Sequence, residues 1–441
     1  MRQPARDRVP RHALAAAGAA PVIDFHDPAE EHRAVGFEPL PDGLEAELVQ
    51  SAERGEIGRV EGSVEHVEVF RTVSVGTSIL EDLDPYPDSD AARTSTPSTA
   101  KSLQCGARKR DIMSNLELTM AGVDYDRFVA MWDGRVRVEG IDLNFLAMPV
   151  EEVFYRQAKY REFDVSEMSL STYVLTLNDE KPPFAAIPVF PSRYFRHQSM
   201  FVNRRSGITE PSQLTGRRIG IPEYQITAGV WQRGILADEY GIGLGDIEYV
   251  SGGVDSPGRH EKVQYDMPAN VRLSQIGPEE TLSELLVSGS IDGIFSAHEP
   301  SCFGNDPDVV RLFPDYKSVE KDYFKRTRIF PIMHLMVVRA EILQAHPWVA
   351  RSLMKACEQA RSLAVDALAY RSSLKVMLPW LADHLEETLE AMGDDYWPYG
   401  IDRNRHVLDA FLRYSHEQGL ANRRWAPQEI FAPSTRSSFV I

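Results

Sequence analysis

The chain has 441 residues, of which 43% are hydrophobic and 26% charged, values that are ordinary for a globular protein of two or three domains. Its formal net charge of −17 argues against bulk binding to nucleic acid or to an acidic membrane, because affinity for phosphate backbones comes from clustered Lys and Arg. Three widely spaced cysteines without a CxxC pair fit a reduced, cytoplasmic protein, and no apolar run approaches the ~20 residues of a membrane span.

The first 112 residues differ in composition from the rest of the chain. They are rich in Asp, Glu, Pro and Ser, as in "EDLDPYPDSDAARTSTPSTAKS", and contain few apolar anchors. The early run "ALAAAGAA" lacks the Leu-rich core of a secretory signal, and no twin-arginine pair precedes it. The sequence therefore predicts that residues 1–112 form a disordered extension without an export signal.

From residue 113 onward, apolar strands alternate with amphipathic helices. Strand patterns and helix patterns alternate in the first half, and the same alternation begins again in the second half. Strands are expected at 116–121, 141–148, 163–169, 185–190, 247–253 and 334–339, and helices at 150–160, 227–241 and 347–368. This alternation predicts an α/β fold with a mostly parallel sheet, followed by a helical C-terminus.

Several stretches of the second half carry a resemblance to known proteins. "ITEPSQLTGRRIGIPE" and "LSELLVSGSIDGIFSAHEP" resemble the second-lobe turns of type II periplasmic-binding-protein folds. Within that fold, "FPSRYFRHQSMFVN", "GIPEYQITAGVWQRGIL" and "WPYGIDRNRHVLDAFLRYSHEQGL" are similar to the 4,5-dihydroxyphthalate decarboxylase family. The resemblance covers residues 115–432 and leaves the first 112 residues outside it.

The resemblance implies a two-lobed α/β fold with central mixed sheets and a cleft between the lobes. Residues 113–203 would form the first part of lobe one and residues 204–333 lobe two. Residues 334–441 would return to lobe one and add the C-terminal helices. Two strands, at 199–203 and 334–338, are expected to cross between the lobes.

The resemblance also implies an activity, the decarboxylation of 4,5-dihydroxyphthalate to 3,4-dihydroxybenzoate (protocatechuate) and CO2 in phthalate degradation. Each carboxylate of that substrate lies para to a hydroxyl, so the ring serves as its own electron sink. Neither pyridoxal phosphate nor thiamine is then required. A carboxy-lyase of this kind would bind a small aromatic dicarboxylate, and an acidic surface is compatible with a monomer or a symmetric homo-oligomer.

Two other functions fit the same scaffold, because function resides in the site rather than in the fold. One is a solute-binding protein that feeds an importer for an aromatic or sulfonate-like anion. The missing export signal argues against it. The other is a thiamine-pyrimidine synthase, which needs a cysteine-rich iron motif that the three scattered cysteines do not provide.

Arginine is the residue type best suited to hold a carboxylate, because its planar fork donates two parallel hydrogen bonds. Arg193 and Arg196 lie three residues apart beside the end of an expected strand, so they are the candidate clamp. The alternatives are solvated loop charges at these two positions, or a clamp formed by Arg233, Arg259 or Arg328.

Histidine is suited to proton transfer near neutral pH. His298, followed by Glu299, ends the expected strand "IFSA", and His197 precedes an expected crossing strand, so these three residues are the candidate catalytic groups. His334 lies within the second crossing strand, where a structural role is favoured. A metal site formed by His298, Glu299 and His334 lacks HxH or HxxxH spacing, so no metal is predicted.

A third set of candidates surrounds the start of the helix at 227–241. Thr227 is expected to cap that helix and to direct backbone N–H groups at an anion, with Tyr224 and Gln225 beside the ligand. Ordinary capping without a ligand is the alternative. Equivalent positions in lobe one are occupied by Ser169, Ser171 and Thr172, and Asp124 and Tyr125 follow the first strand.

Overall fold

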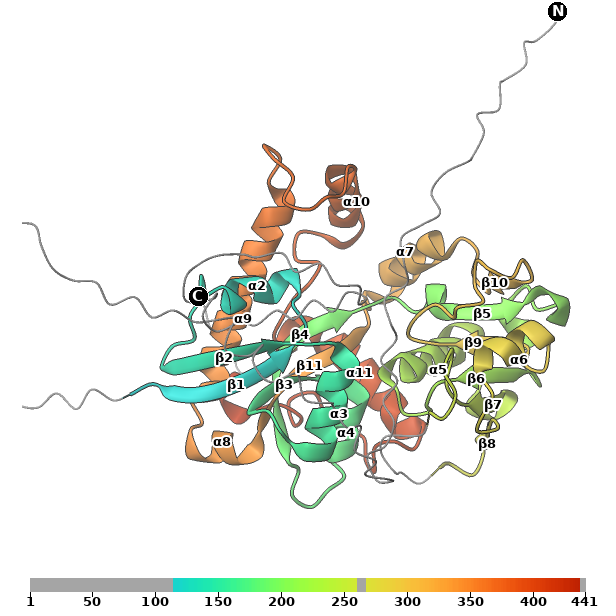
Figure 1. Cartoon of the computed structure of the whole chain (residues 1–441), viewed down its shortest axis with the longest axis horizontal. Helices are drawn as coiled ribbons and strands as arrows, with labels where there is room; N and C mark the ends of the chain where they lie inside the picture. The colour runs from blue at the N-terminus through green and yellow to red at the C-terminus, as the bar shows by residue number, and fades with distance from the viewer. Residues whose placement is uncertain (1–113, 260–266, 437–441) are drawn as a thin grey trace, which may run out of the picture. The chain divides into compact units, whose positions relative to one another are not determined.

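The computed structural model describes residues 114–259 and 267–436, so the extension expected over residues 1–112 lies outside the described residues. A first, five-stranded sheet has the strand order β2-β1-β3-β11-β4 (Figure 1). β1 runs parallel to β2 and β3, whereas β11 is antiparallel to β3 and β4. The strands of the first sheet are β1 (Leu116–Gly122), β2 (Ile141–Ala147), β3 (Val165–Ser169), β4 (Phe184–Arg193) and β11 (Ile332–Arg339).

A second, six-stranded sheet has the strand order β10-β5-β9-β6-β7-β8. β6 runs parallel to β7 and β9, β7 runs parallel to β8, and β5 is antiparallel to β9 and β10. The α/β class with two mixed sheets is thereby confirmed. The strands of the second sheet are β5 (Met200–Asn203), β6 (Arg218–Ile221), β7 (Glu248–Ser251), β8 (Arg272–Gln275), β9 (Gly293–Phe295) and β10 (Val309–Arg311).

Helices connect the strands and form the C-terminal part, as the apolar periodicity predicts. The helices expected over 150–160, 227–241 and 347–368 correspond to α3, α5 and α9. Within the described ranges, no helix is both long and apolar enough to cross a membrane. The helices are α2 (Asp126–Trp132), α3 (Val150–Tyr160), α4 (Leu170–Thr176), α5 (Thr227–Tyr240), α6 (Leu282–Ser288), α7 (Tyr316–Thr327), α8 (Ala340–Ala345), α9 (Val349–Ala369), α10 (Leu381–Met392) and α11 (Ile401–Glu417).

The chain passes between the two sheets just before the strands that were expected to cross. β4 continues to Arg193, where it still pairs with Ile332 of β11, and the chain then enters β5 of the second sheet at Met200. On the return, α7 ends at Thr327 and β11 of the first sheet begins at Ile332. The two crossings are therefore the segments 194–199 and 328–331, because each expected strand finds its hydrogen-bonding partners within a single sheet.

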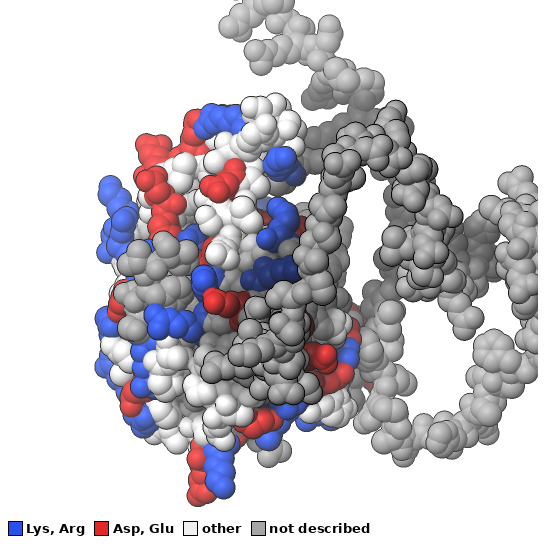
Figure 2. Space-filling model, turned by 90° about the vertical axis from the view of Figure 1, so that its left-hand side faces the viewer, with Lys and Arg blue, Asp and Glu red and all other residues white. Residues whose placement is uncertain are grey.

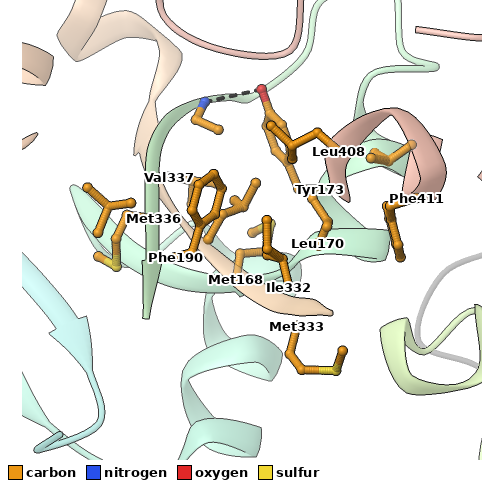
Figure 3. Packing of buried hydrophobic residues seen from close by; sticks show 14 of the residues in the cluster. Met168, Leu170, Tyr173, Phe190, Ile332, Met333, Met336, Val337, Leu408 and Phe411 are labelled. Carbon is orange, nitrogen blue, oxygen red and sulfur yellow. Dashed lines mark hydrogen bonds between the residues drawn. The ribbon is translucent and has the colours of Figure 1, made fainter. Parts of the chain in front are cut away.

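The C-terminal helix α11 packs against elements of both sheets. Figure 3 shows Leu408 and Phe411 of α11 on the side of Tyr173 and Leu170 of α4, in the same apolar cluster as Phe190 of the first sheet. Phe411 also contacts Trp231 of α5, with ring centroids 5.4 Å apart, and the Trp231 indole donates to the Ile332 carbonyl at 2.9 Å. Burial of such large aromatic rings stabilises an interface strongly, so α11 helps to fix the position of α5 relative to the first sheet.

Charged side chains of both signs are interspersed on the face shown in Figure 2. Blue basic and red acidic residues alternate there with uncharged ones. This mixture, together with the formal net charge of −17, offers no extended basic surface to a nucleic acid on the visible described part of that face.

Candidate active site

A pocket lies where strands of both sheets end. On the side of the first sheet, it is lined by the end of β3, by α3 and by the start of β11. On the side of the second sheet, it is lined by residues that follow β6 and β9. Ligand sites in open α/β sheets lie beyond the carboxyl ends of strands, so this position is the expected one for a substrate. The polar residues that line the pocket are Glu151, Ser169, Thr172, Arg196, Gln225, Thr227, Arg259, His298 and His334.

The N-terminus of α5 opens on this pocket. Thr227 was expected to cap this helix, but it is the first residue of α5. The N-cap is Ile226, whose apolar side chain provides no hydrogen bond to the first turn, and Thr227 and Ala228 line the cavity. The first backbone N–H groups of a helix carry partial positive charge and stabilise an anion placed near them. The start of α5 is therefore suited to an anionic group of a ligand.

Hydroxyl and amide side chains join the two sides of the pocket at this point. The Thr227 hydroxyl lies 2.8 Å from the Ser169 hydroxyl and accepts a hydrogen bond from the Ser171 backbone N–H at 3.0 Å. The Thr172 hydroxyl donates to Gln225 Oε1 at 3.2 Å. Thr227 thus links α5 to the β3–α4 turn, and Gln225 and Thr227 both line the pocket.

Arg196 is the buried cation of the pocket. Its Nη1 donates to the Ala297 carbonyl at 3.1 Å, and Nε and Nη2 contact the sulfur of Met333 at 3.1 and 2.7 Å. Burial lowers the pKa of the Arg196 guanidinium from 12.5 to about 10. No carboxylate among the described residues lies within ion-pair distance of it. Arg196 therefore lacks an anionic partner in the described chain, although each of its nitrogens contacts a carbonyl or a thioether.

Arg259, the second cation of the pocket, already has a protein partner. Its Nη2 and Nε lie 2.6 and 2.8 Å from Oε1 of Glu223, a fully buried carboxylate, and Glu151 is 3.7 Å away. The Arg259 charge is therefore largely matched within the protein.

His334 lines the pocket and forms a close pair with a buried carboxylate. Its Nδ1 lies 2.6 Å from Glu167 Oε1, and the Glu167 side chain is completely buried. The Tyr125 hydroxyl donates to the same carboxylate oxygen at 3.1 Å. Burial, with the Glu167 charge, raises the Tyr125 pKa, so the phenol stays protonated and keeps donating. The sequence favoured a structural role for His334, but the structure places it at the pocket.

His298 also lines the pocket, at its exposed rim. Its side chain is 57% exposed, and Nε2 lies 3.9 Å from Asp255. Its expected neighbour Glu299 is not at the pocket, because it forms an ion pair with Arg311 on the surface. The structure thus separates the predicted His298–Glu299 pair.

His197 and Arg193 are corrections to the expected site. His197 is buried between Phe313 and Tyr323, with ring centroids 5.2 Å from each, and neither ring nitrogen has a hydrogen-bond partner among the described residues. Burial lowers the His197 pKa to about 4, so the ring is a neutral packing group. The Arg193 guanidinium donates to the carbonyls of Phe330 and Pro398 and to Asn404, away from the pocket.

Tyr224 and Arg233 are likewise buried outside the pocket. The Tyr224 hydroxyl donates to the Gln418 carbonyl at 3.1 Å, and Arg233 stacks on the Tyr224 ring at 4.0 Å. Arg233 also donates to the Gln418 side chain and to the Tyr224 carbonyl, so both residues connect α5 to the end of α11. Ser171 contributes its backbone N–H to the Thr227 contact, and its hydroxyl is buried without a partner in the described chain.

Glu167 is the main site residue that sequence reasoning missed. It stands in the middle of the short strand "VSEMS", every residue of which is buried. A carboxylate within a buried strand requires a partner, and that requirement was the available signal. Across the described residues, no group of three or more His, Cys, Asp or Glu side chains is arranged to hold a metal ion.

Comparisons with known proteins place these observations in a family context. The chain is 41% identical over 330 residues to a 4,5-dihydroxyphthalate decarboxylase from Comamonas testosteroni, which covers 75% of this chain and 100% of that protein. It is 38% identical over 220 residues to a 4,5-dihydroxyphthalate decarboxylase from Pseudomonas putida, covering 50% of this chain and 85% of that protein. No protein-family model matches the chain.

Among solved structures, the chain is similar to periplasmic sulfonate-binding proteins. One, SsuA from Methylobacillus flagellatus, aligns with a TM-score of 0.45 and 14% identity over 73% of this chain and 93% of that one. Another, SsuA from Escherichia coli, aligns with a TM-score of 0.43 and 10% identity over 73% of this chain and 99% of that one.

Proposed function

We propose that this chain, which belongs to the 4,5-dihydroxyphthalate decarboxylase family, is a carboxy-lyase that converts 4,5-dihydroxyphthalate to 3,4-dihydroxybenzoate and CO2. The observation that carries the proposal is the buried Arg196 guanidinium, which faces the pocket and has no carboxylate partner among the residues described. A buried cation without an anionic partner is costly to a protein, and a substrate carboxylate would provide that partner.

The pocket also provides for the second anionic group of a phthalate. The two carboxylates of the substrate are adjacent on the ring, and the uncapped first turn of α5 lies on the same pocket as Arg196. In this proposal one carboxylate pairs with Arg196 and the other lies near the N–H groups of Thr227 and Ala228. The retained carboxylate is held throughout, whereas the departing one becomes neutral CO2.

The chemistry of the substrate sets the remaining task of the protein. The hydroxyl para to the departing carboxylate donates electron density to the carbon that bears it. That carbon takes up a proton, the bond to the carboxylate breaks, and the electron pair of that bond restores the aromatic ring. Because the ring holds the electrons, the protein must supply a proton and a fixed orientation, and we propose that no organic cofactor or metal takes part.

The test is incubation of the purified full chain with 4,5-dihydroxyphthalate, with release of CO2 and formation of 3,4-dihydroxybenzoate followed together. Equal amounts of both products are expected, also after treatment with a metal chelator. Tight binding of the substrate without either product would instead indicate a solute-binding protein. Cytoplasmic location and oligomeric state stay predictions from the sequence.

A further inference from the structure

We infer that His334 is the catalytic residue that protonates the ring carbon, and that Glu167 is the positioning residue that holds its imidazole in place. The inference rests on the proposed decarboxylation. Its basis is the 2.6 Å contact between His334 Nδ1 and Glu167 Oε1 at the wall of the pocket. With Nδ1 bonded to the carboxylate, Nε2 is the ring nitrogen available to a ligand.

Glu167 has features of a group that supports a neighbouring cation. Its side chain is fully buried, its Oε1 receives both His334 and the Tyr125 hydroxyl, and its Oε2 has no partner within the described part of the chain. A buried carboxylate is stable only beside a positive charge or several donors. A proton donor at His334 carries a positive charge before the transfer, and the 2.6 Å contact would place that charge directly beside this carboxylate.

The backbone and one aromatic ring fix the orientation of His334. β11 pairs with β3 in antiparallel register, with His334 opposite Ser169 and Met336 opposite Glu167, so both members of the pair belong to adjacent strands of one sheet. The Phe154 ring of α3 meets the imidazole edge-on, with centroids 4.8 Å apart at 89°. The His334 side chain is 17% exposed and lines the pocket, so most of the ring is covered by protein.

The proton transfer balances without any further reactant. The Nε2–H bond of the imidazolium breaks as a C–H bond forms at the ring carbon, using an electron pair of the ring. The bond to the carboxylate then breaks, its electron pair returns to the ring, and CO2 leaves. The imidazole next takes a proton from solvent, so one proton is consumed in each turnover.

His298, the other pocket histidine, is less suited to this role. Its side chain is 57% exposed, and its Nε2 lies 3.9 Å from Asp255, beyond hydrogen-bonding distance. An exposed side chain with no fixed partner has no defined orientation toward the ring carbon. The other titratable groups that line the pocket with His334 are Glu151, Arg196, Arg259 and His298.

The experiment compares His334→Asn, Glu167→Gln and the control His416→Asn, an exposed histidine of α11 outside the pocket. His334→Asn should lower kcat by about 10²- to 10⁴-fold and leave the Kd of the substrate within about threefold. Glu167→Gln should lower kcat by at least about tenfold and leave the Kd of the substrate within about threefold, because the imidazole loses the partner that orients it. His416→Asn should match the unmodified chain.

Thermal melting and substrate binding report whether each variant is folded. Added imidazole should restore part of the turnover of His334→Ala in a concentration-dependent manner, which a purely structural histidine would not show. Two results would overturn the assignment of His334 but not the proposed function: turnover of folded His334→Asn at the unmodified rate, or no response of His334→Ala to imidazole. If the unmodified chain released no CO2 from 4,5-dihydroxyphthalate, the proposed function would be wrong. The assignment of His334 would then be wrong as well, because it depends on that reaction.

Discussion

Replacement of Arg196 by Met should have two effects of opposite sign: weaker substrate binding and a more stable unliganded fold. Burial lowers the pKa of the Arg196 guanidinium from 12.5 to about 10. At about 1.4 kcal/mol for each pKa unit, the charge costs the folded state about 3 kcal/mol. Below pH 10 the guanidinium is charged in both the folded and the unfolded chain, so the whole free-energy cost of burying the charge applies. As the pH rises from 10 toward 12.5, the folded chain loses the proton first and the cost falls.

The gain from the substitution is smaller than the full cost of the charge. The introduced methionine side chain would not replace the hydrogen bond to the Ala297 carbonyl, but it would pack against the Met333 sulfur that the guanidinium now contacts. A net gain of about 1 to 3 kcal/mol in the free energy of unfolding follows, since replacement of a buried charge by an apolar side chain is often stabilising. Substrate binding should lose about 2 to 5 kcal/mol, or roughly 30- to 4,000-fold in Kd.

Scanning calorimetry and titration calorimetry measure the two effects, and Arg193→Met is the matched control. Arg193 is also buried, and burial lowers its pKa to about 9, but its guanidinium donates to the Phe330 and Pro398 carbonyls and to Asn404. Its removal relieves a burial cost of about 5 kcal/mol but leaves three acceptors without their donor, at about 1–3 kcal/mol each, so the two terms largely cancel and the Kd should be unchanged. A lower melting temperature of Arg196→Met together with an unchanged Kd would refute the reasoning.

Three further substitutions test the structure away from the pocket. Burial raises the pKa of Glu320 to about 7. The free energy of unfolding should therefore fall as the pH rises from 4.5 through 7, because the folded protein resists ionisation of this carboxyl. Glu320→Gln should remove this pH dependence from melting curves recorded across that range. Burial lowers the His197 pKa to about 4, so the free energy of unfolding should fall as the pH drops from 6.5 through 4, because the buried ring resists protonation. His197→Phe should abolish this loss of stability and leave kcat unchanged. At Gly234 of α5 an added Cβ would overlap the Tyr414 ring, so Gly234→Ala should cost about 1–3 kcal/mol in denaturant unfolding.

The alternation of strands and helices could be predicted because it depends on local periodicity. Apolar residues at a spacing of two or of about 3.6 mark each element, and α3 over Val150–Tyr160 has the bounds that its pattern predicts. Short elements such as β8 (Arg272–Gln275) and β10 (Val309–Arg311) were missed, because strands of three or four residues carry too little pattern. Sheet partners, rather than local sequence, decided where the chain crosses between the sheets.

The site could be predicted only in part, because strand ends locate a pocket but do not direct side chains into it. Gln225, Thr227 and His298 follow strands or begin a helix, and they line the pocket as expected. Tyr224 directly precedes Gln225 but points to Gln418 at the end of α11, a contact 194 positions away in the sequence. No local pattern specifies a contact over such a separation.

Position at the pocket and the lack of a carboxylate partner, rather than burial or the number of contacts, distinguish Arg196 from the other buried arginines of the described chain. Arg193 and Arg233 are as buried as Arg196, but their guanidiniums donate to carbonyls and amides of the protein. Arg259 reaches the pocket, yet its charge is paired with Glu223. Arg196 donates to one carbonyl and, from two nitrogens, to one thioether, and a thioether is a weak acceptor that a ligand carboxylate could replace. Among the carboxylates, Glu167 is distinguished in the same way by position, because it contacts the pocket residue His334 and its Oε2 is unpartnered in the described structure.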